Sequence, residues 1–289
     1  MRRKEFLVMV LPSVVLMTAL LAVPLFQTVR WSLEKVTYGN PGQWTGLTNY
    51  SEALGDPRFR SALIFTVCFT LVAMVLKVII GYALATVLNM VRRSRPVFLG
   101  LVLGSYVVPT VIGATAFSWL FDTNFGGLVN FFLGKVGVGE INWFSQTWPD
   151  RVMLMGNLIW HEVPFAVLIL LAGLQGLPVE PMEAAQIDGA SWIQRQRFVV
   201  IPGLRRLFSF VALISIMDGL RMFDALVPLA PDAVGLHNES IMYYVYDTAF
   251  REGSQNLGLG SAVSVLTLVI ILILLTPFIR QTYKDVKVP

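Results

Sequence analysis

The chain contains six apolar segments, each long enough to cross a lipid bilayer as a helix. Spanning the hydrocarbon core takes about 20 helical residues. The segments cover approximately residues 6–29, 62–90, 97–121, 152–176, 206–229 and 258–279. Charged residues make up 14% of the chain, whereas soluble domains contain about 25%. The sequence therefore predicts an all-α membrane protein with six transmembrane helices in a single domain, residues 1–289.

The first apolar segment begins like a signal peptide, because Arg2, Arg3 and Lys4 precede it. It continues through Pro24–Phe26, which makes it longer than the apolar region of a typical signal peptide. We therefore expect an uncleaved membrane anchor. The single cysteine, Cys68, lies inside an apolar run, so no disulfide framework is expected.

Lys and Arg are concentrated in alternate connections between the predicted spans. In one set of connections the cations outnumber the acids, and in the other set the acids outnumber the cations. Cytoplasmic connections of membrane proteins carry the excess of Lys and Arg. We therefore expect both termini and residues 178–204 on the cytoplasmic side. The cations of the first set are Arg2, Arg3, Lys4, Arg92, Arg93, Arg95, Arg195, Arg197, Arg205, Arg206, Arg280, Lys284 and Lys287.

The polar stretch between the fourth and fifth apolar segments carries the signals of two short helices. Pro181 stands where the first turn of a helix tolerates proline, and Gly189 is a stop signal. Ser191 can cap a second helix over residues 192–200, which would end before Pro202. From these features alone, an amphipathic connector lying on the lipid headgroups is a better interpretation than a protein-docking element.

The same stretch resembles the EAA loop of ABC-importer permeases, whose pattern is E-A-A, three residues, G, nine residues and I-x-L-P. The positions that match in register are Glu183, Ala184, Ala185, Gly189 and Pro202, whereas Val199 and Ile201 depart from the pattern. In that family the loop forms short coupling helices that dock into a cleft on a cytosolic ATPase. The resemblance therefore implies a cytoplasmic coupling loop over residues 178–204, between helices 4 and 5. Its expected ATPase-coupling residues are Glu183, Ala184, Ala185, Asp188, Gly189, Ala190 and Pro202.

Further stretches resemble sugar-type permeases of the maltose and glycerol-3-phosphate class. Residues 46–50 read Gly-Leu-Thr-Asn-Tyr, similar to the GLxNY segment that follows the first span of these proteins. Residues 119–121 and 126–130 resemble the end of their third span and the next loop. The tail at 282–289 does not resemble that of the companion permease of the class. We therefore expect a heterodimer with a second, related permease, and a homodimer stays open.

The resemblance also implies the rest of the assembly and its location. The expected partners are a second homologous permease, two cytosolic ABC ATPases, a periplasmic or extracellular solute-binding protein and membrane lipid. This chain would hold no cofactor, because the partner ATPase would bind ATP and Mg. The net charge of +4 gives no reason to expect nucleic acid. The expected location is the bacterial cytoplasmic (inner) membrane, crossed several times.

Several ionisable side chains lie within the predicted spans, where a charge costs about 2.5 to 3.5 kcal/mol on insertion scales. They are Lys77, His161, Glu162, Asp218, Arg221 and Asp224. Lys77 is expected to pair with an acid of a neighbouring helix or of the partner subunit. Arg221 is three residues from both Asp218 and Asp224, so each pair can meet on one helix face. These three residues form either a structural ion network or part of the substrate path.

The sequence around Pro164 adds a candidate substrate pocket. Proline lacks an N–H, so it frees a carbonyl one turn back and can kink a helix beside a cavity. In maltose-type permeases, the residues between the corresponding Trp and Pro line the sugar pocket, as does the aromatic after the Pro. By this resemblance, and by aligning Phe223 with the aromatic of the family's fifth span, the substrate-binding residues are His161, Glu162, Phe165, Ser215, Asp218, Gly219 and Met222.

The chain departs from the family pattern at two pocket positions. Relatives often have small or amide residues where this chain has Glu162 and Asp218. Carboxylates accept hydrogen bonds from hydroxyl groups, so the departure suggests a ligand that is smaller or more polar than maltose. Phe165 would offer an apolar face to a sugar ring, or it simply packs, and the same alternatives hold for Met222.

These features predict the permease subunit of an ABC importer that moves a sugar or polyol by alternating access. Such a subunit needs no catalytic residue and no Walker A pattern, and His161 and His237 are too far apart in sequence to form a metal site unaided. One alternative is an ion-coupled carrier that uses Glu162 and Asp218. Another is a membrane enzyme with His161 and Glu162 as an acid–base pair. Neither alternative explains the pattern at 183–202, and the sequence does not specify the sugar.

Overall fold

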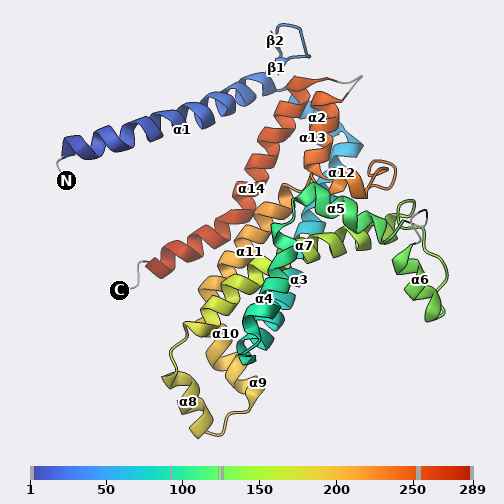
Figure 1. The fold of residues 1–289 in the computed structure, drawn as a ribbon. Coiled ribbons are helices and arrows are strands. Elements are labelled where there is room, and N and C mark those ends of the chain that lie inside the picture. The colour runs from blue at the N-terminus through green and yellow to red at the C-terminus, as the bar shows by residue number, and fades with distance from the viewer. Residues whose placement is uncertain (1–2, 92, 123, 125–126, 252–254, 287–289) are drawn as a thin grey trace. The chain divides into compact units, whose positions relative to one another are not determined.

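The computed structural model describes residues 3–91, 93–122, 124, 127–251 and 255–286. Most of these residues lie in helices, labelled α1 to α14 (Figure 1). Four helices are long and apolar enough to cross a membrane, or up to six spans form if each of two bent pairs counts as one. The predicted helical membrane class is confirmed. Residues used in the sequence interpretation that lie outside the described part are Arg2, Arg92, Gly126 and residues 287–289.

The continuous candidate spans are α1 (Arg3–Ser32), α3 (Pro57–Met90), α7 (Thr147–Gln175) and α14 (Leu257–Val286). Each helix extends beyond its predicted apolar segment at one end or at both, and the membrane boundaries within these helices stay predictions. The reason is that hydropathy detects only the part of a helix that suits lipid. The backbone hydrogen bonds continue into the polar flanks, where water also tolerates a helix.

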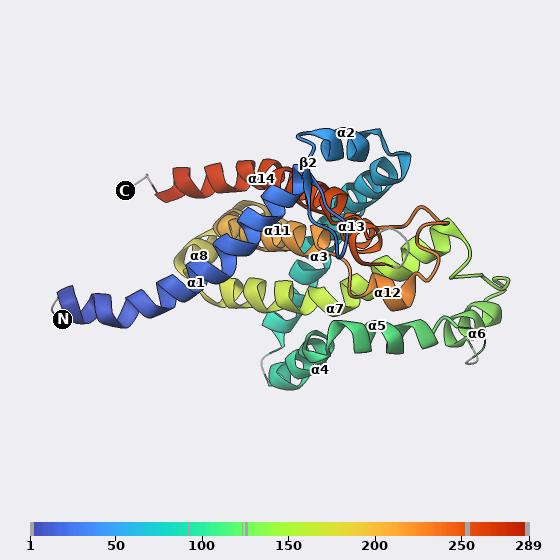
Figure 2. The same cartoon turned by 90° about the horizontal axis from the view of Figure 1, so that it is seen from above.

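The third predicted span is broken in two, contrary to the continuous helix expected over residues 97–121. It consists of α4 (Arg95–Val107) and α5 (Thr110–Trp119), which are bent by 100°. Val108 has extended backbone angles, as a residue before proline prefers, and Pro109 has no N–H to continue the helix. Seen from above in Figure 2, α4 and α5 follow one side of α7, with which both are in contact.

The fifth predicted span is shorter than expected over residues 206–229. Its helix, α11 (Arg205–Leu220), ends at Leu220, and a non-helical segment leads to the short helix α12 (Leu226–Leu229). The expectation that Arg221 and Asp224 meet on one helix face is therefore wrong. Gly219 weakens the helix close to this end because glycine has low helix propensity. At its other end, α11 is bent by 69° from the helical segment Trp192–Gly203.

One compact unit comprises residues 1–61 and 241–273. It contains short elements that the sequence did not reveal: β1 (Glu34–Lys35), β2 (Gln43–Trp44), α2 (Thr48–Gly55) and α13 (Ile241–Phe250). The two strands are antiparallel, with Glu34 opposite Trp44. The buried Asn49 donates two hydrogen bonds, to the carbonyls of Ser32 at 3.0 Å and Glu34 at 2.9 Å. The Gly-Leu-Thr-Asn-Tyr segment thus joins α2 to the end of α1.

A charged cluster in the same unit is centred on Asp247 of α13. Arg58 contacts its carboxylate at 2.6 Å, and Arg251 contacts it at 3.0 Å. Burial by itself would raise the pKa of Asp247, but the hydrogen bonds from these two guanidinium groups outweigh burial and hold the pKa below its ordinary value. The charged carboxylate is therefore favoured in the folded protein.

Asp247→Asn is expected to lower stability near neutral pH by about 1 kcal/mol, the upper range for partly exposed ion pairs. A lowered folded-state pKa gives stability that is fully present above the ordinary pKa of about 3.9 and is lost as the pH falls through the folded-state pKa. The difference from wild type should therefore disappear in strong acid. Thermal unfolding in detergent across this pH range measures it, with Glu52→Gln, an exposed acid on α2, as the control. A loss that does not depend on pH would contradict the electrostatic explanation.

The second compact unit comprises residues 62–240 and 274–289. Its apolar core joins α3, α7 and α11 and consists of Ala85, Leu88, Val163, Ala166, Val167, Leu170, Leu171 and Val211. Small residues allow these helices to approach closely: a Cβ added at Gly81 would meet Ala166 at 2.7 Å, and one at Gly219 would meet Thr70 at 2.7 Å. The unit also contains α6 (Leu128–Lys135). This packing fixes the helices that surround the candidate site.

Candidate functional site

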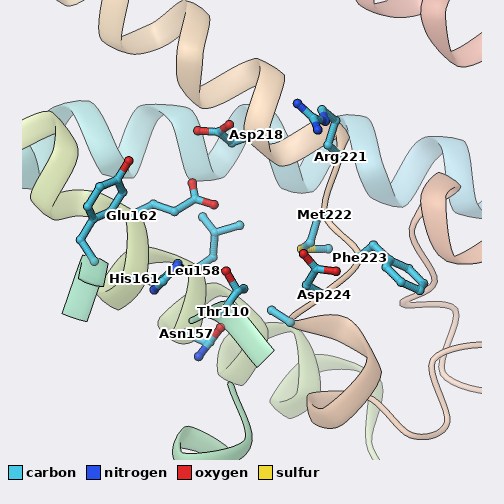
Figure 3. Close-up of a pocket in the computed structure, with 12 residues that line it drawn as sticks. Thr110, Asn157, Leu158, His161, Glu162, Asp218, Arg221, Met222, Phe223 and Asp224 are labelled. Atoms are coloured by element: carbon cyan, nitrogen blue, oxygen red, sulfur yellow. Dashed lines mark hydrogen bonds between the residues drawn. The ribbon is translucent and has the colours of Figure 1, made fainter. Parts of the chain in front are cut away.

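A cavity of about 310 Å³ lies within the second unit. Its wall comes from α4, α5, α7, the end of α11 and the segment 221–225, and Figure 3 shows it from close by. The residues that line it are Tyr106, Thr110, Asn157, Leu158, His161, Glu162, Asp218, Arg221, Met222, Phe223, Asp224 and Ala225. The cavity thus lies where α4–α5 is broken and where α11 ends.

Helix α7 contributes four residues to the wall. Asn157 and His161 are four positions apart, as are Leu158 and Glu162, so all of them share one face of the helix. The Asn157 side chain is 2% exposed, and its amide nitrogen has no hydrogen-bond partner among the described groups. Leaving a buried donor unpaired costs about 1–3 kcal/mol, so an acceptor that reached this amide would stabilise the site.

His161 connects α7 to the break between α4 and α5. A carbonyl at position 105 would normally accept from the N–H of residue 109, but Pro109 has none. His161 Nδ1 lies 3.0 Å from the Ser105 carbonyl, which can only accept, so Nδ1 carries a proton and donates. His161 Nε2 lies 3.2 Å from the Thr110 hydroxyl on the other side of the break. His161 therefore holds both ends of the broken span.

Glu162 is paired with Lys77 of α3. The Lys77 ammonium donates a hydrogen bond to the Glu162 carboxylate, and their side chains are 3% and 22% exposed. The expectation that Lys77 pairs with an acid of a neighbouring helix is confirmed. Lys77 itself does not line the cavity, so it neutralises Glu162 from behind the wall.

The end of α11 and the segment after it supply the opposite part of the wall. Asp218, Arg221 and Asp224 face the cavity, and in the described part of the chain their side chains make no hydrogen bond or close ion pair. Figure 3 shows the Arg221 guanidinium turned away from Asp224. Ser240 donates a hydrogen bond of 2.6 Å to the Met222 carbonyl, which holds this segment in place.

Three residues proposed for the pocket do not line this cavity. Phe165 stacks against Tyr106 with ring centroids 6.1 Å apart, one layer behind the wall. Ser215 is buried, and Gly219 lies against Thr70. The residues of the earlier set that the structure does bring together at the cavity are His161, Glu162, Asp218 and Met222.

The wall also contains residues that were not expected from the sequence, among them Tyr106, Thr110, Asn157 and Leu158. Two signals point to them in retrospect. A proline at position 109, inside an apolar span, marks a helix break beside which Tyr106 and Thr110 are found. Asn157 is a polar residue one turn before His161 on the same helix face.

Residues 178–204 contain two short helical segments joined at Gly189, as predicted. The first helix, α8 (Glu180–Ile187), ends in a Schellman motif: Gly189 has φ of +75°, its N–H bonds Gln186, and the N–H of Ala190 bonds Ala185 at 2.9 Å. Ser191 caps α9 (Trp192–Arg195) with a reciprocal bond to Gln194, as predicted.

The second helix does not end before Pro202, contrary to the prediction. After α9 the chain continues through a π-helix (Gln196–Val200) into α10 (Ile201–Gly203). Pro202 lies at the second position of α10 and, because it has no N–H, cannot donate a backbone hydrogen bond to the π-helical turn before it. Figure 1 shows α8 and α9 together at one end of this unit, beyond α10 and α11.

Large apolar side chains are exposed on this loop. Ile187 is 87% exposed, Ile193 is 70% exposed, and Phe198 is 68% exposed. Apolar residues grouped on a polar segment commonly mark an interaction surface. Glu183 and Asp188 are exposed beside them.

Comparison with known proteins identifies relatives along most of the chain. Residues 77–284 match the family described as binding-protein-dependent transport system inner membrane component. The trehalose/maltose transport system permease protein MalF of Thermococcus litoralis is 31% identical over 265 residues, which cover 91% of this chain and 88% of the relative. The trehalose transport system permease protein SugA of Mycobacterium tuberculosis is 30% identical over 267 residues, which cover 92% and 84%.

A solved structure shares the fold. A chain of a bacterial ABC transporter involved in the import of the acidic polysaccharide alginate superposes with a TM-score of 0.85 and 18% identity, over 98% of this chain and 96% of that chain. The relatives favour the ABC permease over the ion-coupled carrier and the membrane enzyme considered above. The chain belongs to the family of inner-membrane components of binding-protein-dependent transport systems, and it is a transport subunit, not an enzyme.

Proposed function

We propose that this chain carries a sugar or sugar-like solute across the cytoplasmic membrane through the cavity between α4–α5, α7 and the end of α11. The observation that carries this proposal is the chemistry of the wall. Asp218 offers a carboxylate that accepts no hydrogen bond from a described side chain, and Asn157 offers an amide N–H without a partner among the described groups. A sugar hydroxyl can donate to the first and accept from the second. The relatives named for trehalose and maltose transport support the same substrate class.

The coupling function is assigned to residues 178–204. The fixed turn at Gly189 sets the direction of α9 relative to α8, and the exposed Ile187 and Ile193 flank this turn. Such a surface suits docking into a protein cleft, because an isolated apolar patch in water is unfavourable. Its polar members are Glu183 and Asp188, and the remaining residues proposed for coupling are Ala184, Ala185, Ala190 and Pro202.

The proposed assembly follows from the family. A second, related permease completes the pathway, and two cytosolic ABC ATPases bind ATP and Mg. A solute-binding protein delivers the sugar from outside. In this proposal the four continuous helices, the bent pair α4–α5 and α11 give six spans, with both termini and the coupling loop in the cytoplasm.

Transport is proposed to occur by alternating access. Broken helices around a central site are the elements by which many transporters bind and release their substrates. Here, the broken pair α4–α5 and the shortened α11 border the cavity, and His161 joins α7 to the break. Binding of ATP would favour one of two states of the spans through the coupling loop, and hydrolysis would return them to the other.

Co-purification of the tagged chain tests the assembly. An ABC ATPase and a second permease are expected in mass spectrometry of the detergent-purified complex, and vesicles that hold this complex should take up sugar only with ATP and the binding protein. If the chain is recovered alone and vesicles lacking ATP still take up solute down an ion gradient, Glu162 and Asp218 would instead be ion-coupling sites.

A further inference from the structure

The cavity has an uneven set of charges. Its wall carries three carboxylates, those of Glu162, Asp218 and Asp224, and one guanidinium, that of Arg221. The ammonium of Lys77 adds a second positive charge through its bond to Glu162. In this set the negative charges exceed the positive ones by one. The charge of an entering solute is therefore relevant to its affinity.

The Lys77–Glu162 pair contributes little to this excess. Both groups are largely buried and bonded to each other, so their charges nearly cancel at the distance of a ligand. Asp218 differs from Glu162 because no described side chain donates to its carboxylate, on which the Lys77 and Arg221 cations act only as electrostatic neighbours. Figure 3 shows the Asp218 and Glu162 carboxylates on the same side of the cavity, so a carboxylate without a hydrogen-bonded cation lies beside one that has such a cation. Asp224, on the segment after α11, likewise accepts no hydrogen bond from a described side chain.

We propose that Asp218 is the residue that sets the charge selectivity of this permease, so that its substrate is a neutral or amine-bearing sugar and not a uronate. A hydroxyl or an ammonium group can donate to the Asp218 carboxylate, whereas a sugar carboxylate would meet like charge. This inference rests on the proposed sugar-carrying function. The inference assigns the selection of substrate charge to one side chain, because the fold shared with the relatives does not determine this property.

A second observation indicates that the cavity is built to hold a polar ligand. The Asn157 amide nitrogen is buried in the wall without a partner, four residues before His161, whose own ring nitrogens are both engaged. An uncharged donor of this kind recognises hydroxyl or ring oxygens and does not discriminate by charge. Asn157 thus accounts for the recognition of sugar oxygens, and Asp218 accounts for the selection of the sugar by its charge.

The test compares three probes of nearly equal size: glucose, glucosamine and glucuronate. Their binding is measured by saturation-transfer NMR on the complete transporter in lipid nanodiscs without the binding protein, so that only the permease selects. In the wild type, glucuronate is expected to bind roughly tenfold more weakly than glucose, the effect of one nearby charge at an intermediate dielectric. In Asp218→Asn the ratio of the glucuronate Kd to the glucose Kd should fall to near one.

Two further variants separate charge from structure. Asp218→Glu keeps the charge and should retain discrimination. The double variant Lys77→Met with Glu162→Gln removes one charge of each sign, so the glucuronate-to-glucose ratio should stay near the wild-type value even if both affinities change.

Other results would overturn the proposal. Glucuronate binding as tightly as glucose in the wild type would mean that the positive charge of Arg221 dominates the electrostatics of the cavity. An equal loss of discrimination in Asp218→Asn and in the double variant would show that Asp218 has no special role. Binding of none of the three probes would overturn the sugar assignment itself, together with this inference.

Discussion

Replacing Gly189 with valine is expected to lower ATP-driven uptake by a factor of roughly 5 to 30, while the protein still inserts and still binds sugar. Gly189 has φ of +75°, a conformation that costs an L-residue about 1–2 kcal/mol, equivalent to that factor. Its Cβ would meet no atom within 4 Å, so the effect is one of backbone conformation and not of a clash. Relief of the strain requires a change of direction between α8 and α9, and this displaces the exposed Ile187 relative to Ile193.

The matched control is Gly137→Val in the loop that follows α6. Gly137 also has positive φ, +83°, and also has open space around its added Cβ. The two variants therefore impose the same kind of strain at different places. Uptake by vesicles, measured together with the amount of ATPase that co-purifies, should be reduced only for Gly189→Val. Equal reductions would show that general destabilisation is responsible, and wild-type uptake in Gly189→Val would remove the coupling assignment.

The features foreseen from sequence are those that depend on neighbouring residues along the chain. Insertion into lipid depends on the composition of about 20 consecutive residues, which is why the apolar segments locate the helices. The stop at Gly189 and the cap at Ser191 are equally local, since each concerns hydrogen bonds within one turn. The ends of the helices differ from the ends of the apolar segments because a helix can extend into polar sequence.

The features that were missed depend on tertiary structure. Pro109 is visible in the sequence, but the 100° bend and the use of the freed Ser105 carbonyl by His161 require α7 to lie alongside. Asn157 has an ordinary position on a helix and becomes informative only because its amide lacks a partner. The end of α11 at Leu220 was not predicted, because the apolar residues after it keep the hydropathy high and extend the predicted span.

Lys77→Met is expected to destabilise the protein by about 3–5 kcal/mol, the range found when one partner of a buried ion pair is removed. The Lys77 side chain is 3% exposed, and the Glu162 carboxylate that it contacts is 22% exposed. Methionine fills a similar volume but leaves the carboxylate without its donor, so Glu162 must either stay charged in a poorly solvated place or take up a proton. Thermal unfolding of the purified transporter in detergent measures the loss.

Arg221→Met serves as the control, because Arg221 is an exposed cavity cation and its side chain makes no hydrogen bond or close ion pair in the described part of the chain. Its loss should change the stability by less than about 1 kcal/mol. A loss as large as that of Lys77→Met would mean that any cation in this region is needed. The comparison thus separates the buried pair from the overall charge of the cavity.

The double variant Lys77→Met with Glu162→Gln tests whether the ion pair contributes to stability or to the properties of the site. Exchanging both members of a buried pair for uncharged groups of similar volume is often neutral, so most of the lost stability should return. If it does, the pair adds little net stability. Its role is then in the site, where Lys77 keeps the Glu162 carboxylate charged and fixed in direction. The ammonium also cancels most of the field of this carboxylate at the ligand. If the double variant stays as unstable as Lys77→Met, the ion pair itself contributes net stability to the contact between α3 and α7.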